Sequence, residues 1–144
     1  MKRIDSEQDM SRTLRDHMTA AGAHVEQVEC RTSAPGIPDL DGCYRGSNFK
    51  IELKYLSDNK PITKIRSTQK RWFKQRIAAG GMPWCLLYCD SYEGHVIWVL
   101  VAGDHISELP SSARVDHFLS FPHVTFNWTN GIRIYELFGI IAPD

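Results

Sequence analysis

Apolar residues recur at helical spacing in two segments of the chain. The first segment begins at a capping box formed by Ser6 and Asp9 and ends before Gly22. Its apolar positions are Met10, Leu14, Met18 and Ala21. The second segment begins at Ser67, the expected cap, and continues to about Ala79, where a pair of glycines follows. Its apolar positions are Trp72, Phe73 and Ile77. These patterns predict two helices with one apolar face each.

Alternation of apolar and polar side chains predicts the strands. It is clearest over residues 49–55, where four apolar positions alternate with Lys50, Glu52 and Lys54. This segment is expected to have one apolar and one charged face. Shorter patterns predict strands at 24–30, 84–89 and 95–101, and a hairpin of 124–128 with 132–138 around Asn130 and Gly131. Residues 31–35 are small and polar and predict a loop.

The order of these elements predicts the fold class. A helix, strands, a second helix and further strands favour an α/β fold, with a mixed central sheet flanked by helices, over a helical bundle or a sandwich. The chain has 144 residues, of which 42% are hydrophobic, so residues 1–144 are expected to form a single domain.

The formal net charge is +0, so the whole molecule gives no electrostatic reason to bind a polyanion. One segment differs, because residues 60–76 contain no acidic residue. Its basic residues are Lys60, Lys64, Arg66, Lys70, Arg71, Lys74 and Arg76. This segment is expected to bind the phosphates of a nucleic acid. Contacts to phosphates do not distinguish one base from another, so recognition is expected to depend on the structure of the DNA. The alternative is an ordinary solvated basic face.

Cysteine usage and the amino terminus indicate a compartment. The four cysteines are Cys30, Cys43, Cys85 and Cys89. They do not have the spacing of a structural zinc site, and free thiols are expected. The first residues are polar, with no apolar stretch behind them, and no apolar run is long enough to cross a bilayer. These features predict a reducing cytoplasm, bacterial or that of a phage-infected cell.

Three residues carry the candidate chemistry. Glu52 and Lys54 share one face of the predicted strand at 49–55, about 7 Å apart. Asp39 lies thirteen positions before Glu52, and a turn within residues 42–48 can bring the two carboxylates together. Such a pair suits Mg²⁺, which binds one or two carboxylates and completes its shell with waters and phosphate. Lys54 can position a nucleophile or stabilise the transition state, so we expect phosphodiester hydrolysis.

The segments Gly36-Ile37-Pro38-Asp39-Leu40 and Glu52-Leu53-Lys54 resemble the two halves of the PD-(D/E)XK nuclease motif. The likeness covers roughly residues 6–90 and is greatest to stand-alone VRR-NUC domains and archaeal-type Holliday-junction resolvases. It implies a restriction-endonuclease-like core in which Asp39, Glu52 and the Leu53 carbonyl bind Mg²⁺, with Mn²⁺ able to substitute. It also implies catalytic roles for Glu7 and Gln69, a branched or structured DNA substrate, and a homodimer acting in recombination or repair.

Each candidate also has a simpler interpretation. Glutamate and lysine alternate on the open faces of many sheets, and Asp39 could cap a turn after Pro38. Glu7 could serve only the helix dipole, and Gln69 could be an ordinary polar residue at a helix start. The sequence is also compatible with two other functions: a module that binds nucleic acid without cutting it, and a restriction-type or DNA-end-processing nuclease.

Overall fold

The computed structural model describes residues 3–28 and 36–143. Its centre is a six-stranded mixed sheet in the order β1-β2-β3-β5-β6-β8. The strands are β1 (His24–Gln27), β2 (Leu40–Tyr44), β3 (Ser47–Leu56), β5 (Trp84–Tyr92), β6 (His95–Ala102) and β8 (His123–Phe126). β3 and β5 are parallel, whereas all other neighbours are antiparallel. The predicted α/β class with a mixed central sheet is confirmed.

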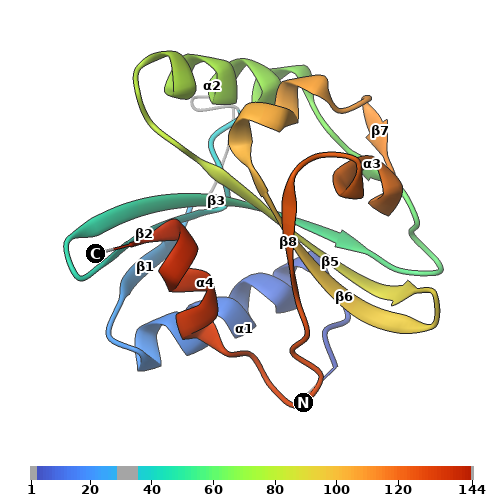
Figure 1. Cartoon of the computed structure of the whole chain (residues 1–144), viewed down its shortest axis with the longest axis horizontal. Helices are drawn as coiled ribbons and strands as arrows, with labels where there is room; N and C mark the ends of the chain where they lie inside the picture. The colour runs from blue at the N-terminus through green and yellow to red at the C-terminus, as the bar shows by residue number, and fades with distance from the viewer. Residues whose placement is uncertain (1–2, 29–35, 144) are drawn as a thin grey trace.

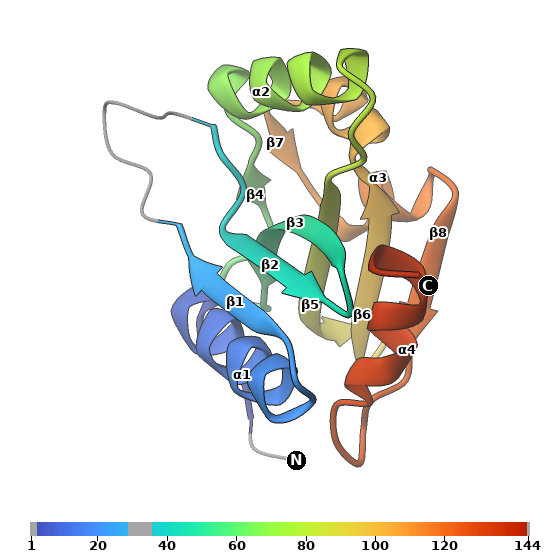
Figure 2. The same ribbon diagram turned by 90° about the vertical axis from the view of Figure 1, so that its left-hand side faces the viewer.

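Helices cover both faces of this sheet (Figure 1). Helices α1 (Glu7–Ala20) and α4 (Ile134–Ile141) lie on one face. The other face carries α2 (Ser67–Ala78), the 3₁₀ helix η1 (Gly103–Glu108), α3 (Val115–Leu119) and a two-stranded sheet of β4 (Thr63–Lys64) with β7 (Ser112–Ala113). Each layer has its own hydrophobic core. Figure 2 shows α1 and α2 on opposite sides of the edge formed by β1 and β2.

The first helix forms as its sequence predicts. The Ser6 hydroxyl accepts a hydrogen bond from the Asp9 amide at 3.0 Å, which satisfies one of the free donors of the first turn. The apolar positions Met10, Leu14 and Met18 are fully buried. Helix α2 differs in one detail, because Ser67 is its first residue and Arg66 holds the cap position.

A tight hairpin joins β2 to β3. Arg45 and Gly46 both have positive φ, 50° and 84°, which is the backbone of a two-residue turn that matches the twist of its strands. Leu40 is paired with Ile51. Asp39 directly precedes β2, so this register brings it level with Glu52.

The charged face predicted for β3 is not exposed to solvent. Glu52 and Lys54 are buried, with exposures of 4% and 6%. β3 is hydrogen-bonded on both edges, and its faces are covered by elements from distant parts of the chain. The predicted charged face is therefore present but buried, unlike the open faces of many sheets, and burial of two charges within a sheet requires that they be paired.

The hairpin predicted at the carboxyl end is also wrong. Its first half is β8, but its second half is helix α4. Ile134, Leu137, Phe138 and Ile141 are buried at helical spacing against the sheet. Short apolar segments fit either structure, and packing decides between them.

Other predictions were met in part. The strand predicted at 24–30 ends at Gln27, while Cys30 and the predicted loop at 31–35 lie outside the described residues. Cys43, Cys85 and Cys89 are free thiols, as expected. Within the described part of the chain, no helix combines the length and hydropathy needed to cross a membrane.

Candidate active site

Asp39 and Glu52 meet at the middle of the sheet. Their carboxyl groups lie within electrostatic reach of each other, and Asp39 Oδ2 accepts a hydrogen bond from the Leu53 amide at 2.8 Å. Asp39 therefore bonds across to the neighbouring strand, which a local cap of the turn after Pro38 would not do.

Lys54 and Gln69 hold Glu52 from the other side. Lys54 Nζ lies 3.2 Å from Glu52 Oε2, and Gln69 Nε2 donates to the same oxygen at 2.7 Å. Lys54 Nζ also donates to the Lys64 carbonyl at 3.0 Å and to Gln69 Oε1 at 3.4 Å. The ammonium group is therefore fixed by three acceptors, which limits its rotation.

Gln69 connects this cluster to helix α2. Its Oε1 accepts a hydrogen bond from the Arg66 amide at 3.0 Å, so it also satisfies a donor at the start of the helix. Gln69 thus closes the first turn of α2 and also contacts Glu52 and Lys54, while its catalytic role stays a prediction.

Burial and like charge change the acidity of the carboxyl groups. Burial raises the pKa of Glu52 to about 8, and Asp39 adds to this shift while Lys54 opposes it. Burial also raises the pKa of Asp39, against the opposing effects of the Leu53 amide and Lys54. Burial therefore favours the protonated, neutral form of both carboxyl groups.

Glu7 lies at the start of α1 and lines the same cavity as Asp39 and Glu52. Its pKa is raised by burial and then by Asp39, which places the two carboxyl groups within electrostatic reach. Glu7 thus lies close enough to Asp39 to affect it, and its catalytic role stays a prediction. Leu53 enters through its amide, and a role for its carbonyl as a metal ligand stays a prediction.

The donor set fits a hard divalent cation. Within residues 3–28 and 36–143, no three His, Cys, Asp or Glu side chains are gathered as a metal-binding group. Asp39 and Glu52 provide two adjacent oxygen ligands, which is the protein contribution usual for Mg²⁺.

These side chains face a cavity of about 830 Å³. Several of its residues were not predicted from the sequence: Gln27, Ile62, Thr63, Thr68 and Ser112. Gln27, Thr63, Thr68 and Ser112 show no local pattern that would mark them. Ile62 does show a local pattern, because it is an apolar residue within a polar segment that contains lysines.

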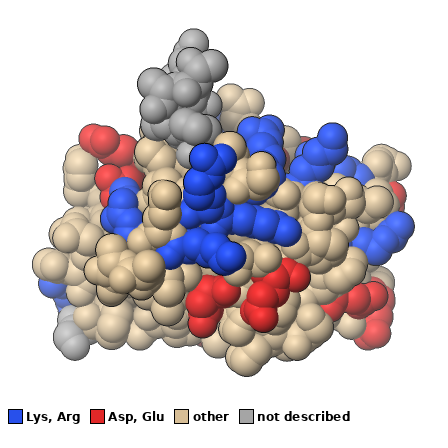
Figure 3. All heavy atoms as spheres, turned by 90° about the horizontal axis from the view of Figure 1, so that it is seen from above, with Lys and Arg blue, Asp and Glu red and all other residues tan. Residues whose placement is uncertain are grey.

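Six of the seven basic residues of segment 60–76 divide into three groups. Lys60, Lys64 and Arg66 line the cavity, whereas Arg71 and Lys74 are exposed further along α2. Lysine and arginine side chains gather on the face that carries α2 (Figure 3). Lys70 is different: its ammonium donates to the Leu109 carbonyl, which ties α2 to the segment after η1.

Comparison with known proteins adds evidence on the fold. No protein-family profile matches the chain, and no curated protein is similar to it in sequence. Among solved structures, it is similar to Hjc, a Holliday junction resolvase of the archaeal hyperthermophile Archaeoglobus fulgidus. The TM-score is 0.54 at 12% identity, over 78% of this chain and 92% of that one. The fold is restriction-endonuclease-like. At this identity the likeness establishes the fold alone, and the resemblance to VRR-NUC domains stays a prediction.

Proposed function

We propose that the protein is a Mg²⁺-dependent endonuclease that hydrolyses phosphodiester bonds in branched or otherwise structured DNA, such as a Holliday junction. The observation that carries this proposal is that Asp39 and Glu52 line one cavity within electrostatic reach of each other, with the Lys54 ammonium 3.2 Å from Glu52 and cations at the cavity's border. The shared fold with a Holliday junction resolvase supports the same substrate class.

Asp39 and Glu52 are proposed to hold the ion, together with the Leu53 carbonyl. When bound, Mg²⁺ would lower the pKa of a coordinated water and offset charge on the scissile phosphate. Glu52 must lose its proton to act as a ligand. In the hydrolysis, the water oxygen forms the new bond to phosphorus, the bond to the leaving sugar oxygen breaks, and that oxygen takes a proton.

Lys54 is proposed to orient the attacking water and to stabilise the additional negative charge of the transition state. Its anchoring by Glu52, Gln69 and the Lys64 carbonyl fixes the ammonium before substrate binds. Gln69 acts as a positioning residue, because its two polar atoms contact both Glu52 and Lys54. Glu7 is proposed to assist from its place beside Asp39 in the cavity lining.

The substrate's phosphates are proposed to contact Lys60, Lys64 and Arg66 at the cavity, and Arg71 and Lys74 along α2. Contacts to phosphates position DNA without reading its bases, which favours selection by shape. A homodimer is part of the proposal, since paired incisions of a four-way junction need two sites related by symmetry.

The test uses purified protein with four-way junctions and linear duplexes of the same sequence. We expect Mg²⁺-dependent cutting of the junction by the wild type. Asp39→Ala and Lys54→Ala should abolish cutting while binding, measured by fluorescence anisotropy, stays within about threefold, since these residues do not supply the main phosphate contacts. Binding without cutting of any substrate by the wild type would instead indicate a non-cleaving nucleic-acid module.

A further inference from the structure

One apolar side chain stands out in the cavity. Ile62 is 38% exposed and is one of four large hydrophobic residues in the described chain with substantial exposure. The others are Met82, Val124 and Tyr135, and none of these three lines the cavity. Single exposed apolar side chains are common on protein surfaces, so the surroundings of Ile62 decide its significance.

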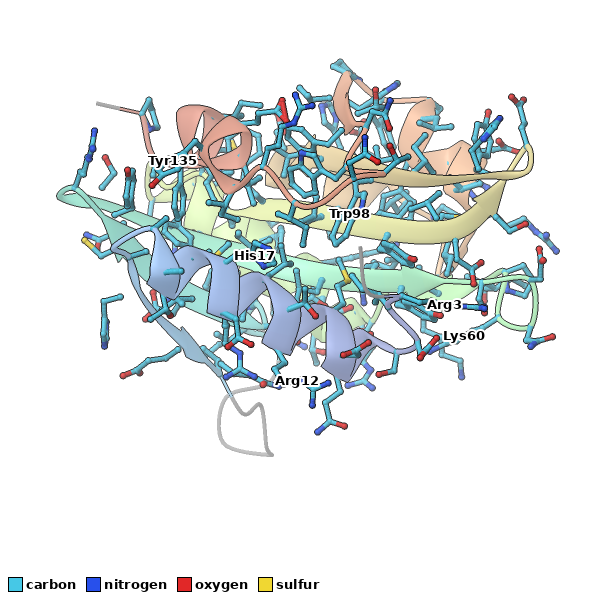
Figure 4. All side chains as sticks on the ribbon, turned by 90° about the horizontal axis from the view of Figure 1, so that it is seen from below. Arg3, Arg12, His17, Lys60, Trp98 and Tyr135 are labelled. Carbon is cyan, nitrogen blue, oxygen red and sulfur yellow. The ribbon has the colours of Figure 1, made fainter. Side chains whose placement is uncertain are left out.

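Two cations flank Ile62. Lys60 and Lys64 are exposed and line the same cavity, and neither ammonium forms an ion pair with any residue that the structure describes. Figure 4 shows Lys60 at the end of the molecule opposite Tyr135, where β3 leads into the loop toward β4. A DNA strand whose phosphates contact both lysines would therefore pass over the isoleucine.

The loop around Ile62 is well fixed. Ser57 and Lys60 exchange backbone hydrogen bonds of 3.0 Å in both directions, which closes the turn after β3. Pro61 restricts the backbone before Ile62, and Thr63 after it is paired with Ala113 of β7. Since the Lys64 carbonyl accepts from Lys54 Nζ at 3.0 Å, the loop is also joined directly to the catalytic cluster.

We propose that Ile62 is a wedge that contacts an unstacked base step beside the scissile phosphate. The inference rests on the proposed function. It specifies the feature of DNA that the site selects, which is a strand whose bases are already unstacked, as at a branch point. The two lysines can bind phosphates, whereas the aliphatic side chain between them can contact only the sugars and bases of the strand. Apolar wedges of this kind open a base step at an energetic cost, which is smaller where stacking is already broken.

The test compares two junctions that differ only at the cleavage site, which is fully paired in one and opened by a mismatch in the other. Ile62→Ala should lower kcat/KM on the paired junction by about tenfold and on the opened junction by less than about twofold, because the opened substrate needs no wedge. Ile62→Met should retain activity on both. Val124→Ala is the matched control, since Val124 is 40% exposed on β8 and lies outside the cavity.

A second measurement does not depend on cutting. In metal-free buffer, 2-aminopurine placed at the step should gain fluorescence on binding wild-type protein and less on binding Ile62→Ala. Equal effects of Ile62→Ala on both junctions, or no effect on either, would overturn the wedge. If the wild type cuts no substrate, the proposed function fails; an Ile62-dependent fluorescence gain would then still support the wedge, and its absence would overturn it.

Discussion

Gln69 Nε2 donates a hydrogen bond to Glu52 Oε2 at 2.7 Å, which joins the first turn of α2 to the middle of β3. The other end of the same amide accepts from the Arg66 amide and from Lys54. Because the amide is satisfied at both ends, its orientation is determined. Gln69 therefore sets the positions of a proposed metal ligand and of the proposed catalytic lysine at once.

Gln69→Ala should slow the chemical step without weakening DNA binding. Loss of a residue that orients metal ligands typically costs about 10–100-fold in activity. Single-turnover cleavage should show a drop of this size, with the Kd for junction DNA within about twofold of the wild-type value. Gln75→Ala, on the exposed side of the same helix, is the control. A rate equal to that of the wild type would show that Gln69 serves only to close the helix.

The stability of the metal-free protein should fall as the pH rises. Glu52 keeps its proton to a pKa of about 8 in the folded state, against an ordinary value of 4.5. Between these values the folded protein binds more protons than the unfolded chain, so the free energy of unfolding decreases with pH. Raising the pH from about 6 to about 8.5 should lower Tm by at least about 3 °C.

Thermal unfolding of Glu52→Gln provides the check, because this variant cannot titrate at position 52 and should show a flatter dependence. Glu26→Gln changes an exposed glutamate of β1 and should keep the wild-type slope. A wild-type Tm that rises over this interval would contradict the raised pKa.

Addition of Mg²⁺ should stabilise the protein through Asp39 and Glu52. The ion competes with the proton for these groups, so the increase in Tm at millimolar Mg²⁺ should be larger near pH 8 than near pH 6. Differential scanning calorimetry with Asp39→Asn and Glu52→Gln should show the increase lost. Asp41→Asn, which alters an exposed acid of β2, should retain it. Retention in Asp39→Asn would place the ion elsewhere.

The basic residues of α2 should separate into phosphate contacts and a structural lysine. Arg71→Ala and Lys74→Ala should each reduce the slope of log K against log salt for DNA binding by about 1, as expected for one phosphate lost. Lys70→Ala should leave the slope unchanged and lower Tm instead, because its ammonium holds the Leu109 carbonyl. Anisotropy titrations at several salt concentrations measure the first effect, and thermal unfolding the second.

Gly36 is packed against the start of α2. Its φ is +86°, and an added Cβ would lie 2.2 Å from the Thr68 carbonyl oxygen. Gly36→Ala should therefore lower the free energy of unfolding by more than the cost of positive φ for an alanine, which is about 1–2 kcal/mol. It should also lower the cleavage rate, because Gly36 lines the cavity and would be displaced. Gly22→Ala is matched, with φ +101° and nothing within 4 Å of the added Cβ. Equal losses of unfolding free energy in the two variants would show that the Thr68 backbone shifts to accommodate the added methyl group.

Local patterns in the sequence were enough to predict several elements. The cap at Ser6 and the buried stripe of α1 follow from side-chain spacing within a few residues, as does the alternation along β3. The positions of Asp39, Glu52 and Lys54 could be proposed because a short hairpin separates them. Their resemblance to a nuclease motif also pointed to Glu7 and Gln69, although no local pattern brings those two to the site.

Only the tertiary structure decided the rest, because it depends on contacts between distant segments. The charged face of β3 is buried since β4 and α2 lie against it, where the Lys64 carbonyl and Gln69 contact Lys54 and Glu52. The segment α4 is a helix because packing favoured one of the two structures that its apolar residues allow. Lys70 became structural through a carbonyl thirty-nine positions away. The sequence alone thus determined which residues could take part in the chemistry, whereas long-range pairing and burial determined which of them meet and which groups keep their protons.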